Sequence, residues 1–174
     1  NRPMLIAANK TDLPGAEENI ERLREALPEL LTRFDVLHLC GKGNLDAALA
    51  DTPGYTQVEF LDADLPDALA AADLVLSRAG SNALCEFQAL AKPLLPVPYP
   101  KGASRGDQIL NAQSYEKRGL CRVLLQENMT ADTLVAALEK TWADRERLIA
   151  AVKAAPPADG TGRVLELIEE VQKK

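Results

Sequence analysis

The sequence is poor in aromatic residues, cysteine and histidine, and each shortage narrows its interpretation. Phe, Trp and Tyr make up 4% of the 174 residues, while apolar residues reach 47%. Ala, Leu and Val must therefore fill the core, which is typical of helices packed on a parallel sheet. Cys40, Cys85 and Cys121 are odd in number and have no ligand spacing, so we predict reduced thiols rather than disulfides or a zinc site. No apolar run reaches the ~18 residues of a membrane-spanning helix.

Positive charge is also scarce. The net charge of −6 argues against a general nucleic-acid binder, because such proteins need clustered Lys and Arg to neutralise phosphates. We therefore expect no nucleic-acid partner. The length is that of one domain with room for a core, so residues 1–174 are expected to form a single domain.

Short apolar runs alternate with longer segments of helical periodicity. Strands are predicted at 4–8, 35–40, 56–61, 73–77, 93–99 and 121–125. Helices are predicted at 16–31, 65–72, 81–91, 107–119, 130–140, 143–153 and 161–173. This alternation predicts an α/β fold with a doubly wound parallel, Rossmann-like sheet.

The stretch "SRAGSNALCEFQAL" (77–90) is the first candidate binding loop, because open α/β sheets bind ligands where their strands end. Gly80 permits a tight turn into the following helix, whose first free amides and dipole would attract a phosphate. Those amides belong to Ser81, Asn82 and Ala83. Glu86 lies one turn deeper and could accept hydrogen bonds from a ribose diol. An ordinary helix start with a first-turn Glu is the open alternative.

The second candidate loop is the long polar stretch "PYPKGASRGDQILNAQSYEKRG" (98–119). Loops of this length in compact domains are often functional. Asp107, Gln108 and Asn111 begin the next predicted helix, and the two amides could face one crevice. Amides and a carboxylate supply the donors and acceptors that sugar hydroxyls need. A solvated helix start, with Asp107 near its cap, is the alternative.

Two other polar features are interpreted as structural. His38 lies inside an apolar strand pattern, which favours a structural role over a catalytic one. Asp62 and Asp64 form a D-x-D pattern, a spacing of carboxylates that can hold a metal ion. Leu65, Pro66 and a helix follow, so we predict a polar turn and cap, with no essential metal site in this chain.

Two separated stretches carry a family resemblance. "AADLVLSRAGSNALCEFQALAKPLLPVPYP" (71–100) and "SRGDQILNAQSYEKRG" (104–119) resemble the carboxyl-terminal, donor-binding domain of the MurG family of glycosyltransferases, family 28. "REALPELLTRFDVLHLCGKGNLD" (24–46) fits the same domain. The resemblance covers about residues 24–174 and implies one half of a GT-B glycosyltransferase.

The resemblance also implies roles for individual residues. It places the diphosphate against Gly80, Ser81, Asn82 and Ala83, the ribose against Glu86, the sugar against Asp107, Gln108 and Asn111, and the uracil against Phe60 and Leu61. The family more often has Gln at the position of Asp107, so a contact between Asp107 and a hydroxyl of the sugar stays open. The catalytic base is not assigned, because in the family it belongs to an amino-terminal domain that this sequence lacks.

The MurG family transfers N-acetylglucosamine from its UDP donor to a lipid-linked muramyl-peptide precursor of peptidoglycan. The resemblance therefore implies an inverting N-acetylglucosaminyltransferase with UDP-N-acetylglucosamine as donor substrate and no cofactor. It further implies a cytoplasmic parent enzyme, peripheral at the inner face of the cell membrane, whose missing acceptor domain or partner chain meets the lipid-linked acceptor. This chain alone is expected to bind donor without turnover. The alternatives are the donor half of a split two-chain N-acetylglucosaminyltransferase and a guanine-nucleotide-binding protein that uses N-K-T-D at 9–12.

The first residues carry a different signal. "RPMLIAANKTDLPGAEENIERLREAL" (2–27) resembles the guanine-specificity segment of Obg-type GTPases through N-K-x-D at 9–12. A GTPase also needs a phosphate loop, and "CGKG" (40–43) lacks the first Gly and the final Ser or Thr of that motif. MurG relatives have "GGS-x-GA" in the loop after the first strand, of which only Gly15 and Ala16 remain. Divergence of this loop and fusion of two proteins both stay open.

Overall fold

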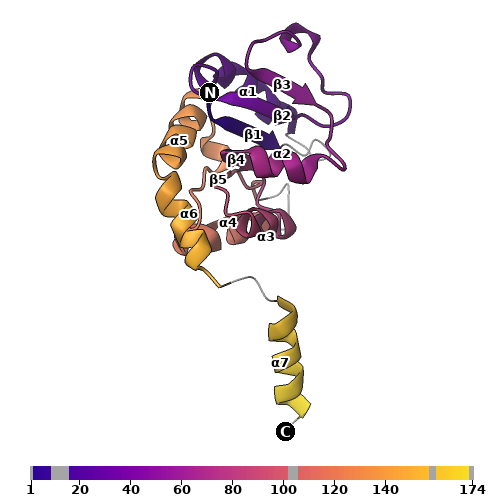
Figure 1. The fold of residues 1–174 in the computed structure, drawn as a ribbon, viewed down its shortest axis with the longest axis vertical. Coiled ribbons are helices and arrows are strands. Elements are labelled where there is room, and N and C mark those ends of the chain that lie inside the picture. The colour runs from indigo at the N-terminus through magenta and orange to yellow at the C-terminus, as the bar shows by residue number, and fades with distance from the viewer. Residues whose placement is uncertain (1, 9–15, 102–105, 157–159, 173–174) are drawn as a thin grey trace.

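The computed structural model describes residues 2–8, 16–101, 106–156 and 160–172 (Figure 1). Its centre is a five-stranded sheet in the order β3-β2-β1-β4-β5, and every neighbouring pair is parallel. The strands are β1 (Met4–Ala8), β2 (Asp35–Leu39), β3 (Tyr55–Val58), β4 (Leu74–Ser77) and β5 (Leu94–Pro96). The predicted doubly wound α/β fold is confirmed.

Helices cover both faces of the sheet. They are α1 (Ala16–Leu30), α2 (Leu65–Ala71), α3 (Ser81–Ala89), α4 (Asp107–Lys117), α5 (Ala131–Ala143), α6 (Arg145–Ala154) and α7 (Gly160–Gln172), with short 3-10 turns η1 (Ala47–Leu49) and η2 (Gln126–Asn128). Side-chain alternation along β1 divides the core in two. Leu5 and Ala7 pack with α1 and α5, whereas Ile6 packs with α2, α3 and α4 on the opposite face.

The strand order fixes where a ligand crevice can form. The chain runs outward from β1 to β2 and β3, then returns to place β4 on the other side of β1. In open parallel sheets, ligands bind at such a reversal, outside the carboxyl ends of the strands. The carboxyl end of β1 and the turn after β4 therefore lie at the topologically favoured position.

Residues 121–125 were predicted as a strand, and this prediction is wrong. The segment runs beside β5, with the Arg122 amide 3.4 Å from the Leu94 carbonyl and the Leu124 amide 3.1 Å from the Pro96 carbonyl. No strand is assigned there. Pro96 has no N–H to donate, and β5 has only three residues, so the ladder cannot extend.

Helix α7 stands apart from the body of the domain (Figure 1). Leu165, Ile168 and Val171 on it are exposed by 56%, 48% and 74%. Among the described residues, neither buried core cluster includes a member of α7. No helix in the described ranges combines the length and apolar character needed to cross a membrane.

Helices α3 and α4 end in the same motif with different residues at the critical position. After α3, the Lys92 amide donates to the Phe87 carbonyl at 3.1 Å and the Ala91 amide to the Gln88 carbonyl at 3.0 Å, a Schellman pair. The residue in the left-handed region there is Ala91, with φ 50°. After α4, Gly119 takes that place with φ 75°.

We expect Ala91→Gly to raise the free energy of unfolding by about 1 kcal/mol, because glycine removes the Cβ clash of the left-handed conformation. Gly119→Ala is the reciprocal control and should lower it by a similar amount, since its added Cβ meets only the Arg147 Nη1 atom, at 3.8 Å. Urea unfolding of the parent and both variants measures this. A destabilised Ala91→Gly protein would contradict the interpretation.

Candidate functional site

The turn between β4 and α3 presents an open helix start. Gly80 is the N-cap residue of α3, and no side chain caps this helix by a hydrogen bond. The Leu84 amide donates to the Gly80 carbonyl at 3.0 Å, so the three preceding amides have no partner inside the helix. They belong to Ser81, Asn82 and Ala83. An uncapped start of this kind can bind an anion.

The backbone of Gly80 corrects one sequence-based argument. Its φ of −65° and ψ of 139° are available to any residue, so the turn does not need glycine for its conformation. A Cβ built on Gly80 would meet nothing within 4 Å. The protein itself therefore gives no steric or conformational reason for glycine here, and the open space adjoins the free amides.

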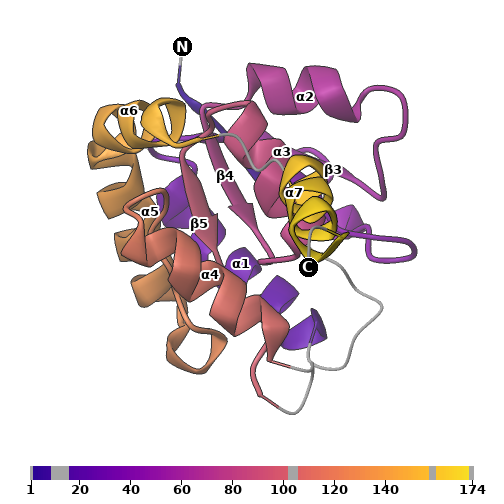
Figure 2. The ribbon, with the colours of Figure 1, turned by 90° about the horizontal axis from the view of Figure 1, so that it is seen from below.

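Helix α4 approaches this turn through one amide side chain. Asn111 Nδ2 donates to the carbonyl of Ala79, 3.3 Å away, and so joins the first turns of α4 to the loop before α3. The Oε1 atom of Gln108 accepts a hydrogen bond from the Tyr99 amide at 3.2 Å. These two hydrogen bonds join the start of α4 to the turn before α3 and to the segment after β5. The ribbons of α3 and α4 can be followed in Figure 2.

The two predicted carboxylates lie outside this hydrogen-bonded group. Glu86 and Asp107 are exposed, on α3 and at the start of α4 respectively. Gly106, which precedes Asp107, has a φ of 83°, so a left-handed glycine turns the chain into α4. Exposed carboxylates at these positions are available to ligand hydroxyls.

The residues predicted to meet a uracil follow β3, at the far edge of the sheet. Phe60 is 57% exposed, and Leu61 is half-buried. Strand β3 lies three positions from β4 in the sheet, which corresponds to roughly 14 Å at normal strand spacing. Phe60 and Leu61 thus share the carboxyl-terminal edge with the α3 start without being adjacent to it.

Sequence reasoning missed Arg78. It directly follows β4, and its side chain is 7% exposed. Its Nη1 atom donates to the Val97 carbonyl and to Gln126 Oε1, each at 2.8 Å. Its guanidinium carbon lies 3.9 Å from the centroid of the Tyr99 ring. The sequence feature that could have identified Arg78 is a positive charge directly after an apolar strand and just before the turn at Gly80.

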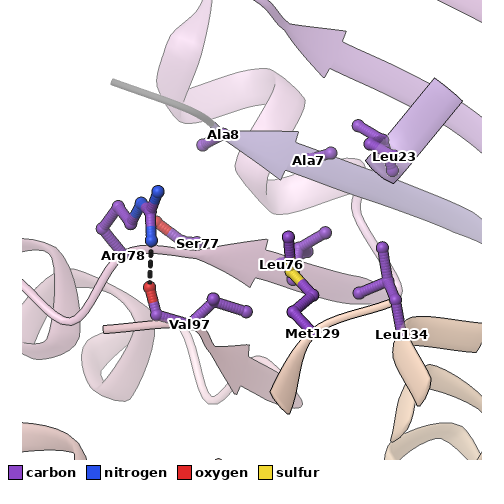
Figure 3. Close-up of a pocket in the computed structure, with 9 residues that line it drawn as sticks. All are labelled: Ala7, Ala8, Leu23, Leu76, Ser77, Arg78, Val97, Met129 and Leu134. Atoms are coloured by element: carbon purple, nitrogen blue, oxygen red, sulfur yellow. Dashed lines mark hydrogen bonds between the residues drawn. The ribbon is translucent and has the colours of Figure 1, made fainter. Parts of the chain in front are cut away.

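Arg78 is a buried cation without a carboxylate partner. Among the described residues, no ion pair includes it, and its buried Nη2 atom has no hydrogen-bond partner. Burial lowers the pKa of Arg78, and Tyr99 opposes that effect. Figure 3 shows the guanidinium between the end of β1 at Ala8 and the Val97 carbonyl.

A small cavity adjoins Arg78 at this reversal between β1 and β4. Its lining residues are Ala7, Ala8, Leu23, Leu76, Ser77, Arg78, Val97, Met129 and Leu134 (Figure 3). Its volume of about 40 Å³ is enough for a few water molecules but too small for a nucleotide. Most of its lining belongs to the core on the face of the sheet that α1 and α5 cover, and Arg78 is its charged group.

His38 lies away from the open helix start, beneath α1. It is 1% exposed, and its Nδ1 atom is 2.8 Å from the Tyr55 hydroxyl. Burial, and secondarily the charge of Arg24, lowers the pKa of His38 to about 4. The side chain is therefore neutral at pH 7 and packed in the core, as the apolar strand pattern suggested.

The D-x-D pattern forms no metal site among the described residues. Asp64 occupies the N-cap position of α2 without making a side-chain cap hydrogen bond, and both it and Asp62 are exposed. No group of three or more His, Cys, Asp or Glu in the described ranges could hold a metal ion. The N-K-x-D motif at 9–12 and the rest of 9–15 lie outside the described residues.

Comparison with known proteins gives consistent matches. Residues 14–169 match the glycosyltransferase family 28 C-terminal domain. A UDP-N-acetylglucosamine--N-acetylmuramyl-(pentapeptide) pyrophosphoryl-undecaprenol N-acetylglucosamine transferase of Lachnospira eligens is 45% identical over 173 residues, 99% of this chain and 48% of the relative. A protein of the same name from Geobacillus thermodenitrificans is 42% identical over 97% of this chain and 47% of its own length.

A solved structure agrees with these sequence matches. The crystal structure of Acinetobacter baumannii MurG has a TM-score of 0.74 and 26% identity, covering 98% of this chain and 50% of that one. The chain spans about half the length of the curated relatives it matches.

The buried state of His38 predicts a pH-dependent stability. The unfolded chain binds a proton near pH 6.5, whereas the folded chain does so only near pH 4, so stability falls as the pH drops between these values. The contribution at stake is at most about 3 kcal/mol. Urea unfolding at several pH values, compared with His38→Gln, should show the difference.

Proton NMR tests the same point directly, because the sequence contains a single histidine. Its ring signals should titrate well below pH 6. A midpoint near 6.5 would contradict the buried neutral state.

Proposed function

The chain belongs to the C-terminal domain of glycosyltransferase family 28, and on that premise we propose that it binds the nucleotide-sugar donor of an N-acetylglucosaminyltransferase. The donor named for its relatives is UDP-N-acetylglucosamine. The observation that carries the proposal is the Asn111 bond to the Ala79 carbonyl. This bond connects the turn before α3 with the first turns of α4. Both lie next to the point where the strand order reverses, between β1 and β4.

The α3 start would hold the diphosphate. The free amides of Ser81, Asn82 and Ala83 and the positive end of the helix dipole favour bound negative charge. Open space at Gly80 lets a phosphate approach the backbone closely. Glu86, exposed one turn further along, would accept hydrogen bonds from the ribose diol.

The start of α4 would hold the transferred sugar through Asp107, Gln108 and Asn111. Gln108 Oε1 is occupied by the Tyr99 amide, so its NH2 group is the part available to a ligand. Asn111 uses an N–H on Ala79, which leaves its carbonyl oxygen as an acceptor. Phe60 and Leu61 would contact the uracil from the loop after β3, and no metal is invoked.

In transfer, the departing group is a nucleoside diphosphate, and its charge grows as the glycosidic bond breaks. Preorganised donors that face this charge lower the barrier, because they stabilise the transition state more than the ground state. The α3 amides would supply that stabilisation. The base that deprotonates the acceptor hydroxyl would come from the half of the relatives that this chain does not span.

The acceptor is proposed from the names of the relatives, which act on a pyrophosphoryl-undecaprenol lipid. A lipid-linked acceptor places the complete enzyme at the inner face of the cell membrane, with the missing half in contact with the lipid. Whether that half belongs to the same polypeptide or to a partner chain makes no difference to the donor site.

Glu86→Ala should weaken UDP binding by about 10- to 100-fold, because the loss of hydrogen bonds to a charged group costs roughly 1.5–3 kcal/mol. Isothermal titration calorimetry with UDP and UDP-N-acetylglucosamine measures this. Glu146→Ala, at an 87% exposed carboxylate on α6, is the matched control and should bind like the parent. Saturable GTP binding without a UDP response would instead favour a guanine site at 9–12.

Gly80→Ala should weaken binding with little change in stability. The backbone of Gly80 suits alanine, and the less flexible unfolded chain favours the variant, but alanine is a poorer N-cap residue than glycine, so the two effects should cancel to within about 1 kcal/mol. Its Cβ would fill the space proposed for the phosphate and weaken UDP binding. Thermal unfolding and calorimetry on the same samples test both points. Unchanged UDP affinity would remove the diphosphate from this turn.

A further inference from the structure

A buried guanidinium joins three segments around the proposed donor site. Arg78 lies two residues before Gly80, and its Nη1 atom bonds both the Val97 carbonyl after β5 and the Gln126 side chain in η2. Gln126 is 8% exposed, and its own carbonyl accepts from Arg22 Nη1 at 3.1 Å. The side chain of Arg78 therefore has little freedom to move.

Arg78 also contacts Tyr99, two residues after Val97. Tyr99 is fully buried, and its ring lies under the guanidinium with 3.9 Å between the carbon Cζ and the ring centroid. Cation–π contacts strengthen when both groups are desolvated. The segment 97–99 is thus held at its first residue by a hydrogen bond and at its last by a stacked ring.

Tyr99 in turn orients Gln108. Its backbone amide donates to the Gln108 side chain at 3.2 Å. A backbone N–H can only donate, so the atom that receives it must be the Gln108 carbonyl oxygen. This settles which way the amide faces: its oxygen points to the chain, and its NH2 group remains as a donor for a ligand.

We propose that Arg78 is a positioning residue for sugar recognition, which fixes the orientation of the Gln108 amide through Val97 and Tyr99. The inference rests on the proposed donor-binding function and adds to it a residue that makes no contact with the sugar. It also specifies the chemistry of recognition. The sugar must offer Gln108 a hydrogen-bond acceptor, such as a hydroxyl or acetamido oxygen.

This arrangement makes a selective prediction. The proposed diphosphate contacts are backbone amides of α3, whereas the chain of contacts from Arg78 ends on Gln108 in α4. Loosening Tyr99 should therefore affect the sugar more than the nucleotide. A purely structural role for Arg78 would weaken both to the same extent.

The test is calorimetric titration of the full chain with UDP and with UDP-N-acetylglucosamine. The measured quantity is the sugar ratio, the Kd for UDP divided by the Kd for UDP-N-acetylglucosamine. Arg78→Lys keeps the charge but loses the planar fork and the stack. It should lower the sugar ratio about fivefold, and Gln108→Ala should do the same. In each variant one neutral hydrogen bond between Gln108 and the sugar is lost. Its Kd for UDP should stay close to that of the parent.

The double variant provides a second criterion. If Arg78 acts through Gln108, then Arg78→Lys combined with Gln108→Ala should lower the sugar ratio no further than either change alone. Gln113→Ala, on the exposed side of the same helix, is the matched control and should leave the ratio unchanged. Additive losses would overturn the proposal.

A milder variant covers the case in which Arg78→Lys does not fold. Gln126→Met removes one acceptor of the guanidinium while the backbone carbonyl that binds Arg22 remains. It should lower the sugar ratio. An unchanged ratio in folded Gln126→Met protein overturns the proposal, and so does an equal loss for both ligands.

The parent protein separates this proposal from the one on which it rests. Absence of UDP binding by the parent would refute the donor-binding function itself. UDP binding with a sugar ratio of one in the parent would leave that function standing and overturn the role of Arg78.

Discussion

The parallel pairing of β1 with β4 is the constraint on which the rest of the molecule depends. Leu5, Ile6 and Ala7 pair with Leu74, Val75 and Leu76, and these residues are buried or half-buried. Because the chain leaves β1 toward β2 and returns beside it as β4, the carboxyl ends of these two strands lie next to each other at one edge of the sheet. The α3 start, the guanidinium of Arg78 and the small cavity all follow from that position.

Unsatisfied donors gather at this edge. The first amides of α3 lack a side-chain cap, α4 also begins without one, and Arg78 Nη2 has no partner in the described chain. Other groups lack partners too, since α2 and α6 also begin without a side-chain cap and Arg122 Nε is buried without an acceptor. Leaving donors unpaired is unfavourable for folding. What distinguishes this edge is that its uncapped helix starts and the Arg78 side chain lie where the strand order reverses.

The fold could be predicted from local pattern, and the site only in part. Short apolar runs and helical periodicity sufficed for β1 to β5 and for the helices, because every one of these elements has an apolar stripe of its own, which all but α7 bury in the core. The segment 121–125 has the same apolar pattern but lies beside a strand limited by Pro96, which is a neighbour effect that its own residues do not reveal. Similarly, the glycine and amides of 80–83 were visible in the sequence, whereas the role of Arg78 depends on Tyr99 and Gln126, which are 21 and 48 positions away.

Helix α7 has a consequence of a different kind. The described residues of the two buried clusters all precede it, and Gln88 Nε2 already meets the chain at the Pro156 carbonyl, 3.2 Å away. A chain trimmed after Pro156 would lose no member of either cluster. Leu165, Ile168 and Val171 thus form an exposed apolar stripe at the end of the chain, outside the two clusters that hold the sheet and its helices together.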